Sequence, residues 1–160
     1  MSYVDVLTLI HTAISLIAIG AGVVAVLALM RNADLRGWTH LFLVTAFLTS
    51  ATGFLFPFGV LTPAMIVGLI ALAILALVAL AFYRYNSARA WRWVHATGMV
   101  ASLYLLVFVG VVQAFQKVAY LNGFAPTQSE LPFVVAQVAT LVFFVGLGIA
   151  AVRAYHPTPA

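Results

Sequence analysis

The chain has 160 residues, of which 66% are hydrophobic and 6% charged. Soluble domains are nearer ~45–50% apolar, so this composition excludes a soluble globular domain and indicates an integral membrane protein. The net charge of +4 comes from seven basic residues that are scattered along the chain, which argues against the clustered basic patch of a nucleic-acid-binding protein. Cysteine is absent, so disulfides and thiolate sites are excluded as well.

The N-terminal segment predicts the first membrane span. A hydrocarbon core of ~30 Å requires ~20 helical residues, and residues 6–30 form an apolar run that ends at "RNADLRGW". The first residues lack the basic start and the small-residue cleavage site of a signal peptide. We therefore expect a permanent span.

Residues 39–83 predict two spans joined by a tight turn. A single helix of that length would extend roughly 67 Å, too long for one crossing. Pro57 and Gly59 are expected to end one helix, and Thr62 followed by Pro63 suits the cap and first position of the next. The predicted spans are 39–58 and 62–83.

Two further apolar runs complete the chain, at 93–115 and 132–153. The sequence therefore predicts an all-α helical bundle, a single transmembrane domain over residues 1–160 with five transmembrane helices. The third span carries no polar residue below its cap, so we expect it at the periphery.

The basic residues predict an orientation. Six of the seven lie in the first connection, in the third connection and at the end of the last span, which share one side of a five-span chain. The positive-inside rule makes that side cytoplasmic, so the N-terminus is expected outside and the C-terminus inside. These residues are Arg31, Arg36, Arg84, Arg89, Arg92 and Arg153.

Polar side chains gather in the outer third of the predicted bundle. Polar groups inside a membrane tend to face neighbouring helices or a cavity, and helical spacing lets four of the five spans contribute to one cluster. We expect a ligand-binding pocket there, formed by His11, Thr49, Thr52, Gln113, Gln116, Lys117, Glu130 and Gln137.

Structural roles are available for the same residues. The threonines can bond to their own helix or pack against a neighbour, and Lys117 can extend to the interface. Ser129 can cap the last helix, with Glu130 in its first turn near the positive end of the dipole.

Two histidines raise the alternative of a b-type haem protein. His40 and His95 open two spans on the inner side, and paired imidazoles are good axial ligands. However, His40 lies on a different helical face from Thr45, at 100° per residue, and both histidines are shallow. Haem b using His40 and His95 stays an alternative to simple interface histidines.

No catalytic constellation is visible. Asp5, Asp34 and Glu130 are the three acidic residues, and neither a carboxylate pair, a phosphate-binding glycine loop nor zinc-type histidine spacing occurs. We expect a protein without a catalytic or metal site, more a binding protein than an enzyme.

Two segments carry a resemblance to a family. "TSATGFLFP" at 49–57 and "FQKVAYLNGFAPTQSELPFVVAQ" at 115–137 resemble a group of small, uncharacterised proteobacterial multi-span inner-membrane proteins. The resemblance implies the bacterial inner (plasma) membrane and no particular activity.

Two classes of function remain open. In the first, the outer pocket binds a small amphipathic ligand such as a quinone, a lipid or a porphyrin. In the second, the protein is a non-catalytic accessory subunit whose partners are other membrane protein subunits as well as membrane lipid.

Overall fold

The computed structural model describes residues 2–33, 36–57, 62–85 and 90–156. Within these ranges every regular element is helical, as the sequence predicts. Four helical segments are long and apolar enough to cross a membrane, which indicates a membrane protein: Tyr3–Met30, Pro63–Arg84, Trp91–Lys117 and Leu131–Ala154. The elements are α1 (Tyr3–Met30), α2 (Arg36–Gly53), α3 (Pro63–Ala79), the π-helix η1 (Leu80–Arg84), α4 (Trp91–Lys117), α5 (Ala119–Phe124) and α6 (Leu131–Ala154).

Helix starts follow local sequence signals. Ser2 and Asp5 form a reciprocal capping box at α1, which satisfies two backbone donors that would otherwise lack partners. Thr62 caps α3 through the backbone N–H of Met65, with Pro63 at the first position, as predicted. Of the predicted turn before it, Gly59 lies outside the described residues.

The start of α6 differs from the expectation. Glu130, not Ser129, is the residue that precedes the helix, and no side chain caps its first turn. The Glu130 carboxylate instead accepts hydrogen bonds from the N–H of Thr127 and of Ser129 and from the Thr127 hydroxyl. The carboxylate is drawn back into the preceding loop because these donors lie closer than the helix terminus.

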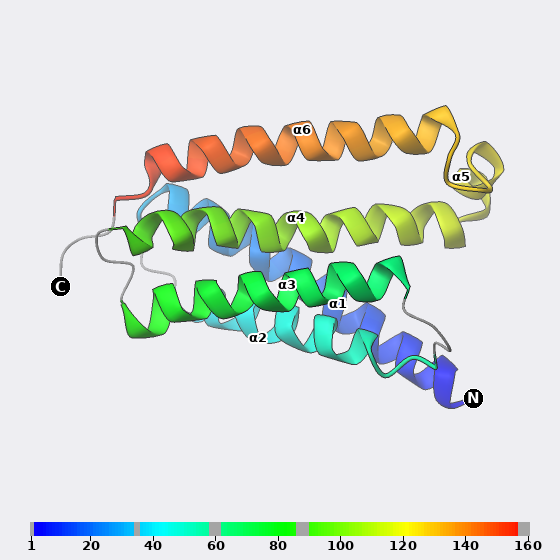
Figure 1. Cartoon of the computed structure of the whole chain (residues 1–160), viewed down its shortest axis with the longest axis horizontal. Coiled ribbons are helices and arrows are strands. Elements are labelled where there is room, and N and C mark those ends of the chain that lie inside the picture. Colours follow the sequence, from blue (N-terminus) through cyan, green and yellow to red (C-terminus); the bar gives the residue numbers. More distant parts are fainter. Residues whose placement is uncertain (1, 34–35, 58–61, 86–89, 157–160) are drawn as a thin grey trace.

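Helices α1 to α4 form a closed, antiparallel four-helix arrangement (Figure 1). Each packs on the next, and α4 packs back on α1. Helix α6 lies outside this ring, mainly against α4, and its buried residues are Phe144 and Ala151. The expectation that the third span is peripheral is therefore wrong. A helix without internal polar residues still packs in the ring, because packing inside a membrane depends on shape more than on polarity.

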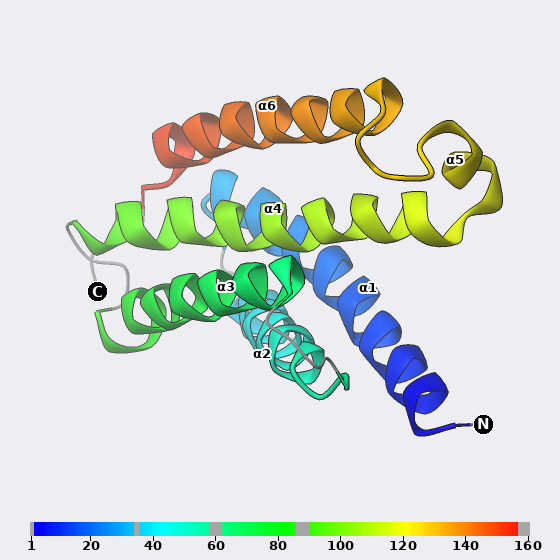
Figure 2. The same cartoon turned by 45° about the vertical axis from the view of Figure 1, so that its right-hand side comes forward.

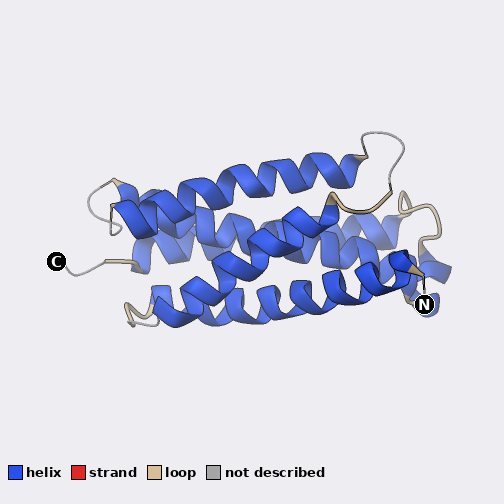
Figure 3. Ribbon diagram, turned by 90° about the horizontal axis from the view of Figure 1, so that it is seen from below, coloured by secondary structure: helices blue, strands red, loops and turns tan. Residues whose placement is uncertain are grey.

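The helices run along one long axis, so the bundle has two distinct ends (Figure 3). The N-terminus of α1, the start of α3 and the short helix α5 lie at one end, which we call the N-terminal end (Figure 1). The last residues of α1, α3 and α6 lie at the other, the C-terminal end. Among the described residues, five arginines belong to the C-terminal end: Arg31, Arg36, Arg84, Arg92 and Arg153. Arg89 of the predicted set lies outside the described residues.

The half of the bundle toward the C-terminal end is closely packed. Gly22 of α1 faces Phe42 and Leu103, and a Cβ atom there would lie 2.7 Å from the Phe42 ring and 2.8 Å from Leu103. Gly98 of α4 similarly leaves no room for a Cβ beside Val78 of α3. These glycines let backbones approach closely, the usual role of small residues between membrane helices.

Candidate functional site

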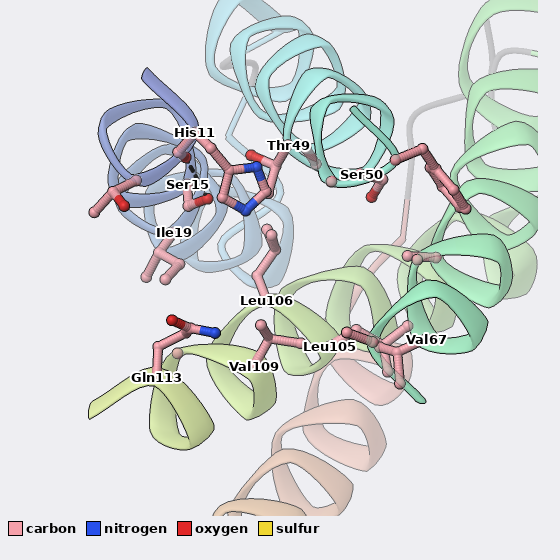
Figure 4. Close-up of a pocket in the computed structure, with 18 of the residues that line it drawn as sticks. His11, Ser15, Ile19, Thr49, Ser50, Val67, Leu105, Leu106, Val109 and Gln113 are labelled. Atoms are coloured by element: carbon pink, nitrogen blue, oxygen red, sulfur yellow. Dashed lines mark hydrogen bonds between the residues drawn. The ribbon is translucent and has the colours of Figure 1, made fainter. Parts of the chain in front are cut away.

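The opposite half of the bundle contains a partly open cavity. Toward the N-terminal end α1 diverges from α4 (Figure 2), and a cavity of about 360 Å³ lies among α1, α2, α3 and α4. This volume falls in the lower part of the ~300–1,000 Å³ range of small-molecule sites. Figure 4 shows the lining residues converging from different helices.

Small residues explain why the helices leave space here. Gly53 of α2, Gly68 of α3 and Gly110 of α4 all line the cavity, together with alanines of α2 and α3. A Cβ atom on Gly110 would meet just one atom within 4 Å, the Cδ1 of Ile19 at 3.9 Å. The nearest atoms to a Cβ on Gly53 and Gly68 belong to His11 at 3.8 Å and Phe54 at 3.4 Å, so the side chains opposite these glycines approach the wall without overlapping it.

The cavity wall is mainly apolar, with a minority of polar groups. The polar lining residues are Thr8, His11, Thr12, Ser15, Thr49, Ser50, Ser102, Gln113 and Lys117. On α1 the polar residues recur at helical spacing, which turns them toward one face. An apolar wall with a few convergent polar groups is typical of a small-molecule binding site.

His11 is held in a fixed orientation. Its Nδ1 lies 2.8 Å from the Thr52 hydroxyl oxygen, and its ring makes an edge contact with Phe56 at a centroid distance of 5.5 Å. Gly53 lies beside the ring, since a Cβ there would be 3.8 Å from His11 Cε1. The imidazole is therefore positioned from α2 while it projects from α1.

Two buried hydroxyls in the cavity wall lack hydrogen-bond partners among the described residues. These are Thr49 Oγ1 and Ser102 Oγ, on residues that are 7% and 2% exposed. Most buried polar atoms in native structures are paired, and an unpaired one costs ~1–3 kcal/mol. The two hydroxyls come from different helices, α2 and α4.

The structure brings together half of the predicted site residues. His11, Thr49, Gln113 and Lys117 all line the cavity. Thr52 does not line it but contacts His11 directly. Figure 4 shows Gln113 on α4 across from His11 on α1, so the predicted convergence of these two helices is present.

The remaining predicted residues lie elsewhere. Gln116 points to the loop, where its amide lies 3.4 Å from Gln128, and Glu130 bonds Thr127 and Ser129. Gln137 donates to the carbonyl oxygen of Phe108 at 3.2 Å and so joins α6 to α4. None of these three lines the cavity.

Two polar side chains of the 113–137 stretch instead bond backbone groups near the end of α4. Asn122 donates to the Phe115 carbonyl at 3.1 Å, and Gln128, at a positive φ of 60°, donates to the Val112 carbonyl at 3.4 Å. The last carbonyls of a helix lack intrahelical partners. Much of the polarity of this stretch is therefore structural.

Sequence reasoning missed several lining residues. Thr8, Thr12, Ser15, Ser50 and Ser102 were not assigned to the pocket, although all line the cavity. The stripe of Thr8, His11, Thr12 and Ser15 at helical spacing was the available signal for α1. Ser15 also donates to the His11 carbonyl at 2.6 Å, the self-bonding expected of a helical serine.

His40 and His95 do not form a haem site. The Nδ1 of His40 is 2.7 Å from the Tyr83 hydroxyl, and the side chain of Phe82 contacts both histidines, with centroid distances of 5.2 Å to His40 and 5.4 Å to His95. His95 is stacked on Phe82, with an interplanar angle of 20°. A bis-histidine haem needs both imidazoles to face one iron across the porphyrin, whereas here an aromatic side chain contacts both rings.

Metal binding by side chains finds no support in the described residues. No group of three or more histidine, aspartate or glutamate side chains converges within the part of the chain that the structure describes.

Comparison with known proteins assigns no relative. No family model, curated protein or solved structure matches this chain.

Proposed function

We propose that the protein is a five-span protein of the bacterial inner membrane with its N-terminal end facing outward. Helix α2 has 18 residues and so extends ~27 Å, close to a hydrocarbon core. It lies alongside α1 and α3 within the ring. Five arginines at the C-terminal end against Lys117 at the other support the cytoplasmic placement of the C-terminal end.

Protease accessibility tests this orientation. A tag after residue 160 should be protected in intact spheroplasts, whereas a protease site inserted between Gly123 and Thr127 should be cut. Cleavage of both or of neither would contradict the five-span arrangement.

The proposed biochemical role is binding of a small amphipathic molecule from the membrane in the cavity. The observation that carries it is a mainly apolar cavity whose wall includes a minority of polar side chains from different helices, among them His11 and Gln113. Such polar groups offer hydrogen bonds to one end of a bound molecule, and the apolar wall suits the rest of it.

The volume and chemistry of the cavity favour some of the proposed ligands over others. A quinone or a single-chain lipid suits a narrow cavity of about 360 Å³, whereas a porphyrin requires a wider, flatter space. Lys117 at the end of α4 lines the same cavity and gives it a charged group near the proposed outer surface.

A cavity-filling substitution tests the proposal. Gly110→Leu places a side chain into open space, because a Cβ there contacts only Ile19 at 3.9 Å. Glycine in a helix interior is also less favourable than other residues by ~1 kcal/mol. The variant should therefore keep or raise its unfolding temperature in detergent while losing the small molecules that mass spectrometry detects in an extract of the purified protein.

Gly146→Leu is the matched control. Gly146 lies exposed on α6, away from the cavity, and a Cβ atom added there would meet no neighbouring atom within 4 Å. Retention of the same molecules by the Gly110 variant would disprove the cavity as their site. An extract without any retained molecule, combined with stoichiometric partner proteins, would favour the accessory-subunit alternative.

A further inference from the structure

The hydrogen bonds around His11 determine which of its nitrogens carries the proton. Thr52 Oγ1 lies 2.7 Å from the Leu48 carbonyl and 3.2 Å from the Thr49 carbonyl, and it donates toward both. A threonine hydroxyl has a single hydrogen, and carbonyl oxygens can only accept. We assign the hydrogen to the nearest of these acceptors, the Leu48 carbonyl, because helical threonines commonly donate to the carbonyl four residues before them. In that arrangement it is not available to His11.

In the hydrogen bond between His11 and Thr52, His11 is consequently the donor and Thr52 the acceptor. With its hydrogen committed, Thr52 Oγ1 can only accept from His11 Nδ1 at 2.8 Å. In neutral imidazole one nitrogen donates and the other accepts. His11 thus carries its proton on Nδ1, and Nε2 presents a lone pair.

That lone pair faces the cavity. Figure 4 shows the His11 ring with one nitrogen toward α2 and the other toward the space between Leu106 and Gln113. No protein donor among the described residues bonds to Nε2, since the one hydrogen bond of the His11 ring is that from Nδ1. The occupant of the cavity must supply a donor at this position.

From this geometry we infer that the cavity selects a lipid-soluble hydroquinone, whose phenolic O–H donates to His11 Nε2, over the corresponding oxidised quinone. The inference rests on the proposed function. Phe56, whose ring contacts that of His11, lines the cavity and suits an aromatic head. Ile19, Leu105 and Leu106 provide an apolar wall for the tail. A quinone has only carbonyl oxygens at its head, which face the Nε2 lone pair without a hydrogen.

Binding of one compound in two redox forms tests the selectivity. A short-tailed benzoquinone, and the same compound reduced under argon, are titrated into the purified protein in lipid nanodiscs by calorimetry. The hydroquinone should bind about fivefold more tightly or better, the factor that one net hydrogen bond of ~1 kcal/mol supplies.

Thr52 provides the decisive variant because it is a positioning residue that does not line the cavity. Thr52→Val removes the acceptor that holds the proton on Nδ1, so the ring can adopt the other tautomer and donate from Nε2 to a carbonyl. The preference for the hydroquinone should disappear while the quinone binds as well as before or better. Thr52→Ser keeps the hydroxyl and should keep the preference.

Thr45→Val is the control on the same helix. Thr45 also donates to backbone carbonyls, of Leu41 and Phe42, but neither lines the cavity nor contacts His11. Its variant should retain the wild-type preference, and a shift equal to that of Thr52→Val would overturn the tautomer argument.

The outcomes separate this inference from the proposed function. Equal binding of both forms by the wild type, or tighter binding of the quinone, would overturn the hydroquinone selectivity and leave a ligand-binding cavity. If neither form binds but the Gly110→Leu variant loses other molecules, the cavity binds a ligand of a class other than quinones. Absence of any bound molecule would overturn both.

Discussion

The two halves of the bundle use the same small residues with opposite results. In the half toward the C-terminal end, Gly22 faces Phe42 and Leu103 so closely that a Cβ atom would clash. In the half toward the N-terminal end, Gly110 faces open space bounded by Ile19. A glycine therefore permits close packing where the opposite side chain reaches into the space of the missing Cβ, and leaves room where the opposite side chain stops at van der Waals distance.

The halves also differ in how they satisfy polar groups. At the C-terminal end, Asn32 donates to the Ala154 carbonyl at 2.8 Å and accepts from the N–H of His156 at 2.6 Å, while Arg92 donates to the Tyr155 carbonyl at 3.2 Å. These bonds close the end of α6 onto the bundle. In the other half, polar side chains such as His11 and Gln113 face the cavity. Buried atoms without partners among the described residues occur in both halves, on Thr49 and Ser102 in the cavity wall and on His95 toward the C-terminal end.

Truncating one phenylalanine in each half tests most directly whether the two halves differ in packing. Phe42 is fully buried, and its removal leaves a hole that neighbouring helices cannot close. Phe42→Ala should cost about 3 kcal/mol, the lower end of the range for buried aromatics, because lipid is as apolar as the core and only packing is lost. Thermal or denaturant unfolding in detergent gives the value.

Phe54→Ala is the matched truncation in the half that contains the cavity. Phe54 is 36% exposed and lines the cavity, so its removal should cost about 1 kcal/mol or less. Equal losses of stability in the two variants would show that the half with the cavity is packed as tightly as the other half.

A smaller effect distinguishes two glutamines that the sequence placed in one site. Gln137 joins α6 to α4 through the Phe108 carbonyl, so Gln137→Leu should lower stability by ~0.6 kcal/mol, with ~1.7 as the upper limit for such bonds in membranes. Gln113 lines the cavity and points across it toward His11, so Gln113→Leu should leave stability unchanged and reduce the bound molecule. Unfolding temperature and ligand content measured on both variants check the contrast.

The opposite result for the two glutamine variants would contradict this prediction. If Gln113→Leu unfolds well below the wild type while Gln137→Leu keeps its stability, the amide of Gln113 has a structural partner in the folded protein, and the cavity loses one of its polar groups.

The sequence predicted the helices well because each depends on local information. Apolar run length located the long helices, and the Thr62–Pro63 pair located the start of α3. The arrangement of the helices was less predictable, since the ring contains apolar α3 and leaves α6 outside. Contacts between membrane helices depend on side-chain shape, which a polarity pattern does not encode.

The site was predicted in part for a similar reason. Helical spacing and depth correctly brought His11 and Gln113 to one cavity. Depth alone, however, could not separate cavity residues from loop residues at the same level. Glu130 and Gln116 bond within the loop because backbone donors and a neighbouring glutamine lie nearer to them than the cavity does.

The smallest expected effect concerns that loop and its pH dependence. Partial desolvation raises the pKa of Glu130, but hydrogen bonds from the Thr127 hydroxyl and from backbone N–H groups, including those of Thr127 and Ser129, outweigh it, so the pKa lies below its ordinary value of 4.5. A carboxylate with a lowered folded-state pKa stabilises the folded loop above the unfolded-state pKa, and this contribution is lost as the pH falls through the folded-state value. Glu130→Gln should thus lower the resistance of the 125–130 segment to proteolysis at pH 7, while at a pH well below the lowered folded-state pKa wild type and variant should be cut at the same rate by an acid-active protease. A difference between them that persists unchanged at low pH would show that Glu130 holds the loop through its shape and not through its charge.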